Sequence, residues 1–325
     1  MGDGMVGFSY FCRSNFRRMI GELFAIGVAF LWSGSAIFFD YVNRTLSALN
    51  SNLIRFFFGF FPITILLLCI SGDFFFAHAN LLSVLWIASA GFVGFVFGDY
   101  FLFASYKLIH ASYTQLIMTL SPLFAAFTGF LLLGERLTYN ILLGMLVTLF
   151  GIALTIVRKP ESAQKFGLAI SKRGIFFAVL SALGQGVGLV LSKKGLAEYH
   201  LSAGASCTDF YISIAATQIR IITGFVCFLL IVMLRRGGAR DFVGSFRHPK
   251  PVAASCAGAF LGLGVGVPLS LLALQYTQTA IVSTIIATVP IIILLYNRIF
   301  KKRKITVKEA VGVLLSVAGV AVLFL

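Results

Sequence analysis

One acidic residue, Asp99, lies well inside a long apolar segment of the sequence. If that segment crosses a bilayer, a carboxylate near its centre costs about 2.5–3.5 kcal/mol on insertion scales, so it must face water or a partner. Asp99 could therefore exchange a proton, or hold a cation that a substrate displaces. The alternative is a carboxylate near a helix end that forms an ion pair with Lys107 or Arg55.

Two arginines, Arg55 and Arg220, stand at matching early positions of two other apolar segments. Each guanidinium could bind the anionic group of a substrate. Alternatively, each arginine anchors its helix, either by extending its charge to the membrane interface or by capping a neighbouring helix. The residue types alone leave both roles open.

Polar and aromatic side chains on the apolar segments could line a cavity for a small molecule: Trp32, Tyr106, Gln115 and Gln185. Glutamines in a membrane can form hydrogen bonds between helices or with a ligand. Lys193 and Lys194 end an apolar segment, and we expect them to contact lipid headgroups. No catalytic residue and no metal site is predicted, because no soluble-enzyme motif is present and the four histidines are scattered.

Membrane-spanning helices must position these residues. Of the 325 residues, 59% are hydrophobic and only 11% are charged, whereas a soluble domain carries about a quarter charged residues. About 20 apolar residues cross a bilayer as a helix. The sequence therefore predicts an all-α integral membrane fold with ten transmembrane helices, at residues 20–40, 53–71, 82–104, 111–133, 139–157, 174–194, 210–234, 252–273, 279–300 and 307–325.

An internal repeat divides the ten helices into two sets of five. Pro122 lies near the middle of the fourth segment, and Pro290 has the same place in the ninth, 168 positions later. The same shift pairs glycines of the two halves: Gly94 with Gly262, Gly98 with Gly266, Gly144 with Gly312 and Gly151 with Gly319. Because five is odd, the second copy must be inverted in the membrane, as in many transporters whose site lies at the midplane. Each proline deletes a backbone hydrogen bond and bends its helix, as a hinge or as a static kink.

The expected organisation is an N-terminal segment at 1–19, a five-helix repeat at 20–157, a linker at 158–173 and a second repeat at 174–325. The net charge of +15 comes from basic residues between apolar segments, where they contact lipid headgroups, so no nucleic-acid partner is expected. The five cysteines form no C-x-x-C pair and indicate neither a disulfide framework nor zinc. The distribution of basic residues favours termini outside the cell.

Several short motifs agree with one known family: Leu120-Ser121-Pro122-Leu123, Gly134-Glu135-Arg136-Leu137-Thr138, Arg55-Phe56 and Trp32-Ser33. With them the chain resembles the EamA family of the drug/metabolite transporter superfamily over about residues 20–325. The match is weaker in the second half, where basic residues replace the Gly-Glu pair. The resemblance implies a ten-helix carrier of small metabolites, often an exporter, with alternating access around a central cavity. Members usually place both termini in the cytoplasm, against the charge distribution, so the orientation stays open.

We therefore expect a secondary transporter of small metabolites, and not an enzyme. Its cavity would lie at the midplane between the repeats, with Asp99 coupling transport to protons and Pro122 and Pro290 acting as hinges. The expected partners are a small-molecule substrate, such as an amino acid or amphipathic compound, and the bilayer of a cell membrane, in the first instance a bacterial inner membrane. A homodimer is an open alternative, and no cofactor is expected. An intramembrane enzyme and a non-transporting scaffold are the rival interpretations.

Overall fold

A computed structural model describes residues 3–43, 45–109, 111–156, 171–300, 302 and 305–324, and every regular element within these ranges is a helix. The first half contains α1 (Asp3–Val42), α2 (Ala48–Ser71), α3 (Leu81–Gly91), the π-helix η1 (Phe92–Phe97), α4 (Gly98–Leu108), α5 (Ala111–Met118), α6 (Ser121–Leu133) and α7 (Tyr139–Ile156). The second half contains α8 (Lys172–Ala203), the short η2 (Gly204–Ser206), α9 (Asp209–Leu234), α10 (Gly238–Ser245), α11 (Pro249–Ala259), the π-helix η3 (Phe260–Gly266), α12 (Val267–Tyr276), α13 (Thr279–Ile286), α14 (Val289–Phe300) and α15 (Val307–Leu323).

Nine helical segments of the described chain are long and apolar enough to cross a membrane. Four of them combine consecutive elements, so that α3 with η1 and α4 forms one span, as do α5 with α6, α11 with α12, and α13 with α14. The tenth predicted span corresponds to α15, whose 17 residues reach about 25 Å at 1.5 Å per residue. The all-α membrane fold predicted from composition is confirmed.

The internal repeat is visible in the places where helices change type or break. The π-helix η1 begins at Phe92, and η3 begins 168 positions later at Phe260. The fourth span breaks before Ser121 and the ninth breaks before Val289, again with a shift of 168. In both cases the proline is the second residue of the new helix, where its missing N–H is tolerated. The two prolines therefore begin new helices rather than bending continuous ones.

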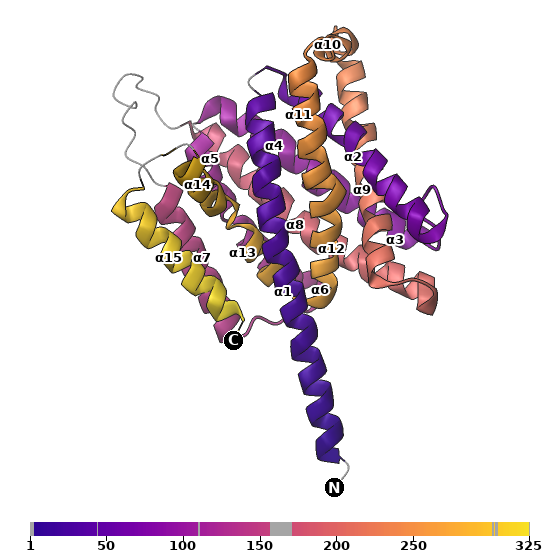
Figure 1. The fold of residues 1–325 in the computed structure, drawn as a ribbon, viewed down its shortest axis with the longest axis vertical. Helices are drawn as coiled ribbons and strands as arrows, with labels where there is room; N and C mark the ends of the chain where they lie inside the picture. Colours follow the sequence, from indigo (N-terminus) through magenta and orange to yellow (C-terminus); the bar gives the residue numbers. More distant parts are fainter. Residues whose placement is uncertain are drawn as a thin grey trace.

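The last helices of the two repeats, α7 and α15, pack side by side in opposite directions (Figure 1). A Cβ on Gly144 would lie 2.9 Å from the carbonyl oxygen of Gly319, and a Cβ on Gly319 would lie 2.8 Å from that of Gly144. Gly151 and Gly312 approach each other in the same reciprocal way, at 2.6 Å in both directions. This exchange is what an inverted pair of repeats produces when equivalent faces meet at a pseudo-twofold axis.

Both termini lie at one end of the bundle, and α10 lies at the other (Figure 1). Arg18 Nη2 donates a hydrogen bond to the carbonyl oxygen of Leu323 at 2.5 Å, which joins the start of the first span to the end of the last. We call these two ends of the bundle the termini face and the α10 face.

Candidate functional site

Three helices bring Asp99 together with Arg55 and Gln185, a group that we call the Asp99 cluster. Asp99 lies in the first turn of α4 and is 7% exposed. Arg55 Nη2, from α2, lies 2.7 Å from Asp99 Oδ2, and Gln185 Nε2, from α8, donates a hydrogen bond to Asp99 Oδ1 at 3.2 Å. Of the two partners considered for Asp99, Arg55 forms the ion pair, and the side chain of Lys107 lies outside the described residues.

The π-helix η1 and its glycines allow α8 to reach this cluster. Gln185 Nε2 also donates a hydrogen bond to the carbonyl oxygen of Gly94, within η1, at 3.1 Å. A Cβ on Gly188 would lie 2.8 Å from Gly94 Cα, and a Cβ on Gly98 would lie 3.1 Å from Gln185 Nε2. Larger residues at these positions would push α8 away from Asp99. Single π-helical turns inside α-helices occur frequently at functional sites.

Arg55 keeps part of its side chain accessible. The side chain is 22% exposed, and its guanidinium lies 4.9 Å from the centre of the Phe56 ring and 5.7 Å from that of Phe39. Its Nε is buried and has no hydrogen-bond partner. The cluster thus contains a paired carboxylate beside a cation that still has a free donor.

Arg220, which occupies the place of Arg55 in the second repeat, has a different environment. It is 4% exposed on α9, and its guanidinium lies 4.3 Å from the centre of the Phe95 ring. The Arg220 side chain forms neither a hydrogen bond nor an ion pair with another residue within the described ranges, and its Nε is buried without a partner. The shift of 168 places Val267 where the first repeat has Asp99, so the second repeat lacks the matching carboxylate.

Trp32 and Gln185 occupy equivalent places in the two repeats. Gln185 lies beside Gly98, just after η1, and Trp32 lies beside Gly266, at the end of η3, where a Cβ would be 2.6 Å from Trp32 Nε1. Both side chains are partly exposed. The structure therefore places Gln185 in the Asp99 cluster and Trp32 against the π-helix of the other repeat.

The other predicted site residues lie on the broken helices or beside them. Gln115 is half-buried in α5, whereas the side chain of Tyr106 lies outside the described residues. Pro122 is buried at the start of α6, and Pro290 is partly exposed at the start of α14. Ser33 Oγ donates a hydrogen bond to the carbonyl oxygen of Val289 at 3.4 Å, which joins α1 to the break in the ninth span.

A second polar cluster, which the sequence did not reveal, lies at the termini face. Lys193 Nζ is 2.6 Å from Glu135 Oε1 and donates a hydrogen bond to the carbonyl oxygen of Thr277 at 2.6 Å. The backbone N–H of Thr279 donates to Glu135 Oε2 at 3.0 Å, and its hydroxyl donates to Glu135 Oε1 at 3.0 Å. We call these four residues the Glu135 cluster. The expectation that Lys193 contacts headgroups is wrong, because the ammonium is directed inward to this carboxylate.

The Glu135 cluster joins the two repeats at the termini face. Glu135 lies between α6 and α7, whereas Thr279 begins α13, so the carboxylate also stabilises the N-terminus of that helix. All eight residues of α13 are buried. In α14, on the α10 side of the break, only Ile291 and Leu294 are buried. The side chains of the ninth span are therefore buried near the termini face and mostly more exposed towards the α10 face.

Comparison with known proteins agrees with this architecture. The model of the EamA-like transporter family matches residues 19–157 and 172–325, one match for each repeat. A protein of known crystal structure is similar with a TM-score of 0.69 and 16% sequence identity, over 93% of this chain and 95% of that one. None of the curated proteins compared with the chain matches it. Since the two family matches span nearly all of the sequence, the chain belongs to the EamA-like transporter family.

Proposed function

We propose that the chain is a secondary carrier that moves a small metabolite across a cell membrane by alternating access. The observation that supports this most is the unequal enclosure of the two faces. In an inverted pair of repeats, α5 and α13 are equivalent, yet α13 is buried throughout while Gln115 to Met118 of α5 are partly exposed. Equivalent helices in unequal environments are expected of a carrier in a conformation that is closed on one side.

In this state the Glu135 cluster closes the termini face. Opening that face would require Glu135 to release Thr279 and Lys193, and the broken helices α5–α6 and α13–α14 supply places where the halves of a span can move separately. Pro122 and Pro290 would act as hinges, because each lies at the break between two helices and donates no backbone hydrogen bond across it.

The Asp99 cluster is the proposed coupling site. Protonation of Asp99 would remove the charge that holds Arg55 and would leave the guanidinium available to a substrate. Trp32, Tyr106, Gln115 and Gln185 would line the substrate cavity. The first substrates to test are amino acids and amphipathic compounds. We propose export as the direction of transport. The oligomeric state to examine is a homodimer.

Reconstitution tests this function. The purified chain in liposomes should show counterflow of one member of such a panel, and an imposed pH gradient should drive its uptake. Asp99→Asn should retain counterflow but lose the response to the pH gradient, because counterflow needs no net proton movement. A chain that shows no counterflow with any compound, and leaves Trp32→Cys and Gln185→Cys unreactive to water-soluble maleimides, would instead behave as a scaffold. Full pH coupling in Asp99→Asn would remove Asp99 from the mechanism.

A further inference from the structure

The segment that carries α10 is the connection between two membrane-spanning helices on the α10 face (Figure 1). The span of α9 ends at Leu234, and the next span begins at Pro249. The fourteen-residue connection at 235–248 is therefore held at the level of the lipid headgroups on that face. Nothing in the proposed transport cycle uses this segment.

Basic side chains are concentrated in and beside this connection. The exposed ones are Arg235, Arg236, Arg240, Arg247, His248 and Lys250. The only acidic residue between positions 235 and 250 is Asp241. None of these basic side chains forms an ion pair with a carboxylate in the part of the chain that the structure describes. Clusters of four to eight basic residues next to a membrane span attract anionic lipids.

The apolar side of α10 has the form of an interfacial helix. Phe242 is partly buried and packs against the hydrophobic core, and its ring centre is 5.4 Å from that of Phe246. Val243 is 68% exposed and Phe246 is 44% exposed. Exposed apolar side chains beside basic ones are typical of a helix that lies in the boundary between headgroups and acyl chains.

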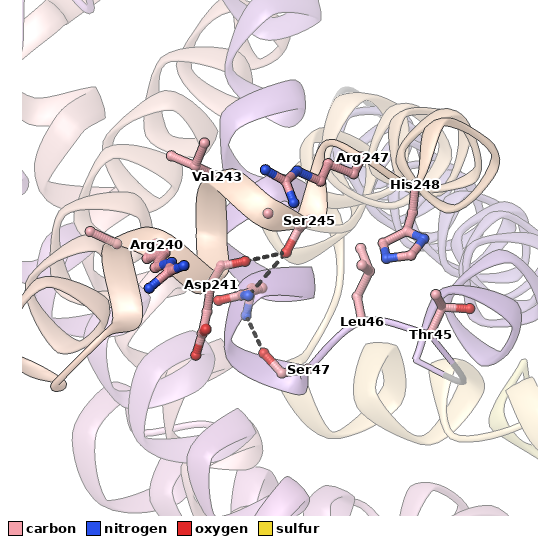
Figure 2. A pocket seen from close by; sticks show the side chains of 12 residues that line it. Thr45, Leu46, Ser47, Arg240, Asp241, Val243, Ser245, Arg247 and His248 are labelled. Atoms are coloured by element: carbon pink, nitrogen blue, oxygen red, sulfur yellow. Dashed lines mark hydrogen bonds between the residues drawn. The ribbon is translucent and has the colours of Figure 1, made fainter.

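A pocket of about 690 Å³ separates α10 from the connection between α1 and α2. Figure 2 shows Arg240 and Asp241 on one side of Ser245 and Arg247 on the other, with His248, Leu46 and Thr45 grouped beyond Arg247; all of them line the pocket. Asn50 Nδ2, from α2, donates a hydrogen bond to Ser245 Oγ at 3.0 Å, and the Ser245 hydroxyl donates to the carbonyl oxygen of Asp241 at 3.0 Å. Both Asn50 and Ser245 are buried, so this wall is fixed by internal hydrogen bonds.

We propose that this pocket binds the phosphate of an anionic glycerophospholipid, with Arg240 and Arg247 as its charged ligands. Guanidinium groups suit phosphate because their planar donors match its oxygens in pairs. Val243 and Phe246 would contact the acyl chains of the same lipid. A soluble phosphate has no acyl chains and could not make these contacts. The place of the pocket at headgroup level, rather than on a part of the protein in bulk water, favours the lipid as the source of the phosphate.

Thermal unfolding of the full chain in detergent tests the proposal, with phosphatidylglycerol, phosphatidylcholine of the same acyl chains, and inorganic phosphate as probes. Phosphatidylglycerol should raise the unfolding temperature, and the other two should not. In R240Q/R247Q, the phosphatidylglycerol concentration that gives half of the shift should rise on the order of tenfold. The matched control is R235Q/R236Q, which removes the same charge from residues that do not line the pocket and should retain the wild-type response.

Each other outcome overturns the proposal. An equal loss in R235Q/R236Q would mean that the lipid responds to net charge and not to this pocket. A shift with inorganic phosphate as large as that with phosphatidylglycerol would assign the site to a soluble phosphate. If R240Q/R247Q does not fold, R240Q and R247Q are measured singly, and an unchanged lipid response in both would exclude the two arginines as ligands.

Discussion

The Ser316 hydroxyl donates a hydrogen bond to the carbonyl oxygen of Thr148 at 3.2 Å, and the two residues are separated by the repeat distance of 168 positions. Each is the other's equivalent in the opposite repeat, and neither is exposed. Residues that occupy equivalent positions can meet in this way only near the pseudo-twofold axis. The contact between α7 and α15 is therefore where the two inverted halves are joined most closely.

We predict that Gly151→Ala destabilises the protein by about 1–3 kcal/mol, the usual effect of adding an atom to a packed interior. A Cβ at Gly151 would lie 2.5 Å from the backbone nitrogen of Ser316 and 2.6 Å from the carbonyl oxygen of Gly312, and backbone atoms cannot move aside. Thermal unfolding measures the effect. Gly244→Ala is the control, since nothing lies within 4 Å of its Cβ position. An unchanged unfolding temperature for Gly151→Ala would contradict the close contact between α7 and α15.

The repeat could be predicted from the sequence because it depends on the residue types at fixed spacing, whereas the prolines are expected to bend continuous helices and instead begin new ones. Pro122 and Pro290 cannot donate a backbone hydrogen bond, and their spacing alone gives the repeat distance. The π-helices η1 and η3 could not be predicted in this way, because their glycines are equally compatible with a regular α-helix. Their positions become visible only when α8 and α1 pack against them.

The partners of charged residues depend on contacts between distant segments. The sequence leaves both Lys107 and Arg55 as candidate partners for Asp99, and only the contact between α2 and α4 shows that Arg55 forms an ion pair with it. Lys193 follows an apolar segment, as headgroup-binding lysines do, but the connection that carries Glu135 lies 58 residues earlier in the chain. No sequence pattern within a single helix predicts the contact between Lys193 and Glu135.

A double-mutant cycle on the Asp99 cluster should show strong coupling. Asp99→Asn leaves Arg55 without a counterion, and Arg55→Gln leaves a buried carboxylate unpaired. Each should destabilise the protein by about 1–3 kcal/mol, less than the 3–5 kcal/mol for a fully buried pair because the Arg55 side chain is 22% exposed. The double variant should be more stable than the sum of the two effects implies. Additive losses of unfolding free energy would mean that the two side chains do not interact.

Arg220→Met should leave the protein as stable as the wild type, or make it more stable. The substitution removes a buried charge that lacks a carboxylate partner within the described chain, and replacing buried charges by apolar side chains is often neutral or stabilising. The loss of the contact with Phe95 offsets this by at most about 2 kcal/mol. Denaturant titration in mixed micelles measures the change. A loss of unfolding free energy beyond about 2 kcal/mol would show that Arg220 has a stabilising partner. The variant Phe95→Leu measures the contribution of the aromatic ring alone.

Weakening the Glu135 cluster should open the termini face. Glu135→Gln keeps an acceptor for Thr279 but removes the charge that holds Lys193, and charge-assisted hydrogen bonds are about twice as strong as neutral ones. Ser283, on α13, is 4% exposed and reports on opening once it is replaced by cysteine in a background without the native cysteines. Its reaction with a water-soluble maleimide added from the termini face should accelerate on the order of tenfold, as a loss of about 1.4 kcal/mol implies.

The matched control for this prediction is Glu198→Gln, the same chemical change one helical turn after Lys194. Glu198 Oε1 lies 3.1 Å from Lys194 Nζ on α8, and this pair joins two residues of a single helix. Removing it breaks no contact between the repeats, so the labelling rate at Ser283→Cys should not change. If both substitutions accelerate labelling equally, the effect comes from loosening α8 itself. If neither does, contacts other than the Glu135 carboxylate keep α13 buried, and the cluster does not close the termini face.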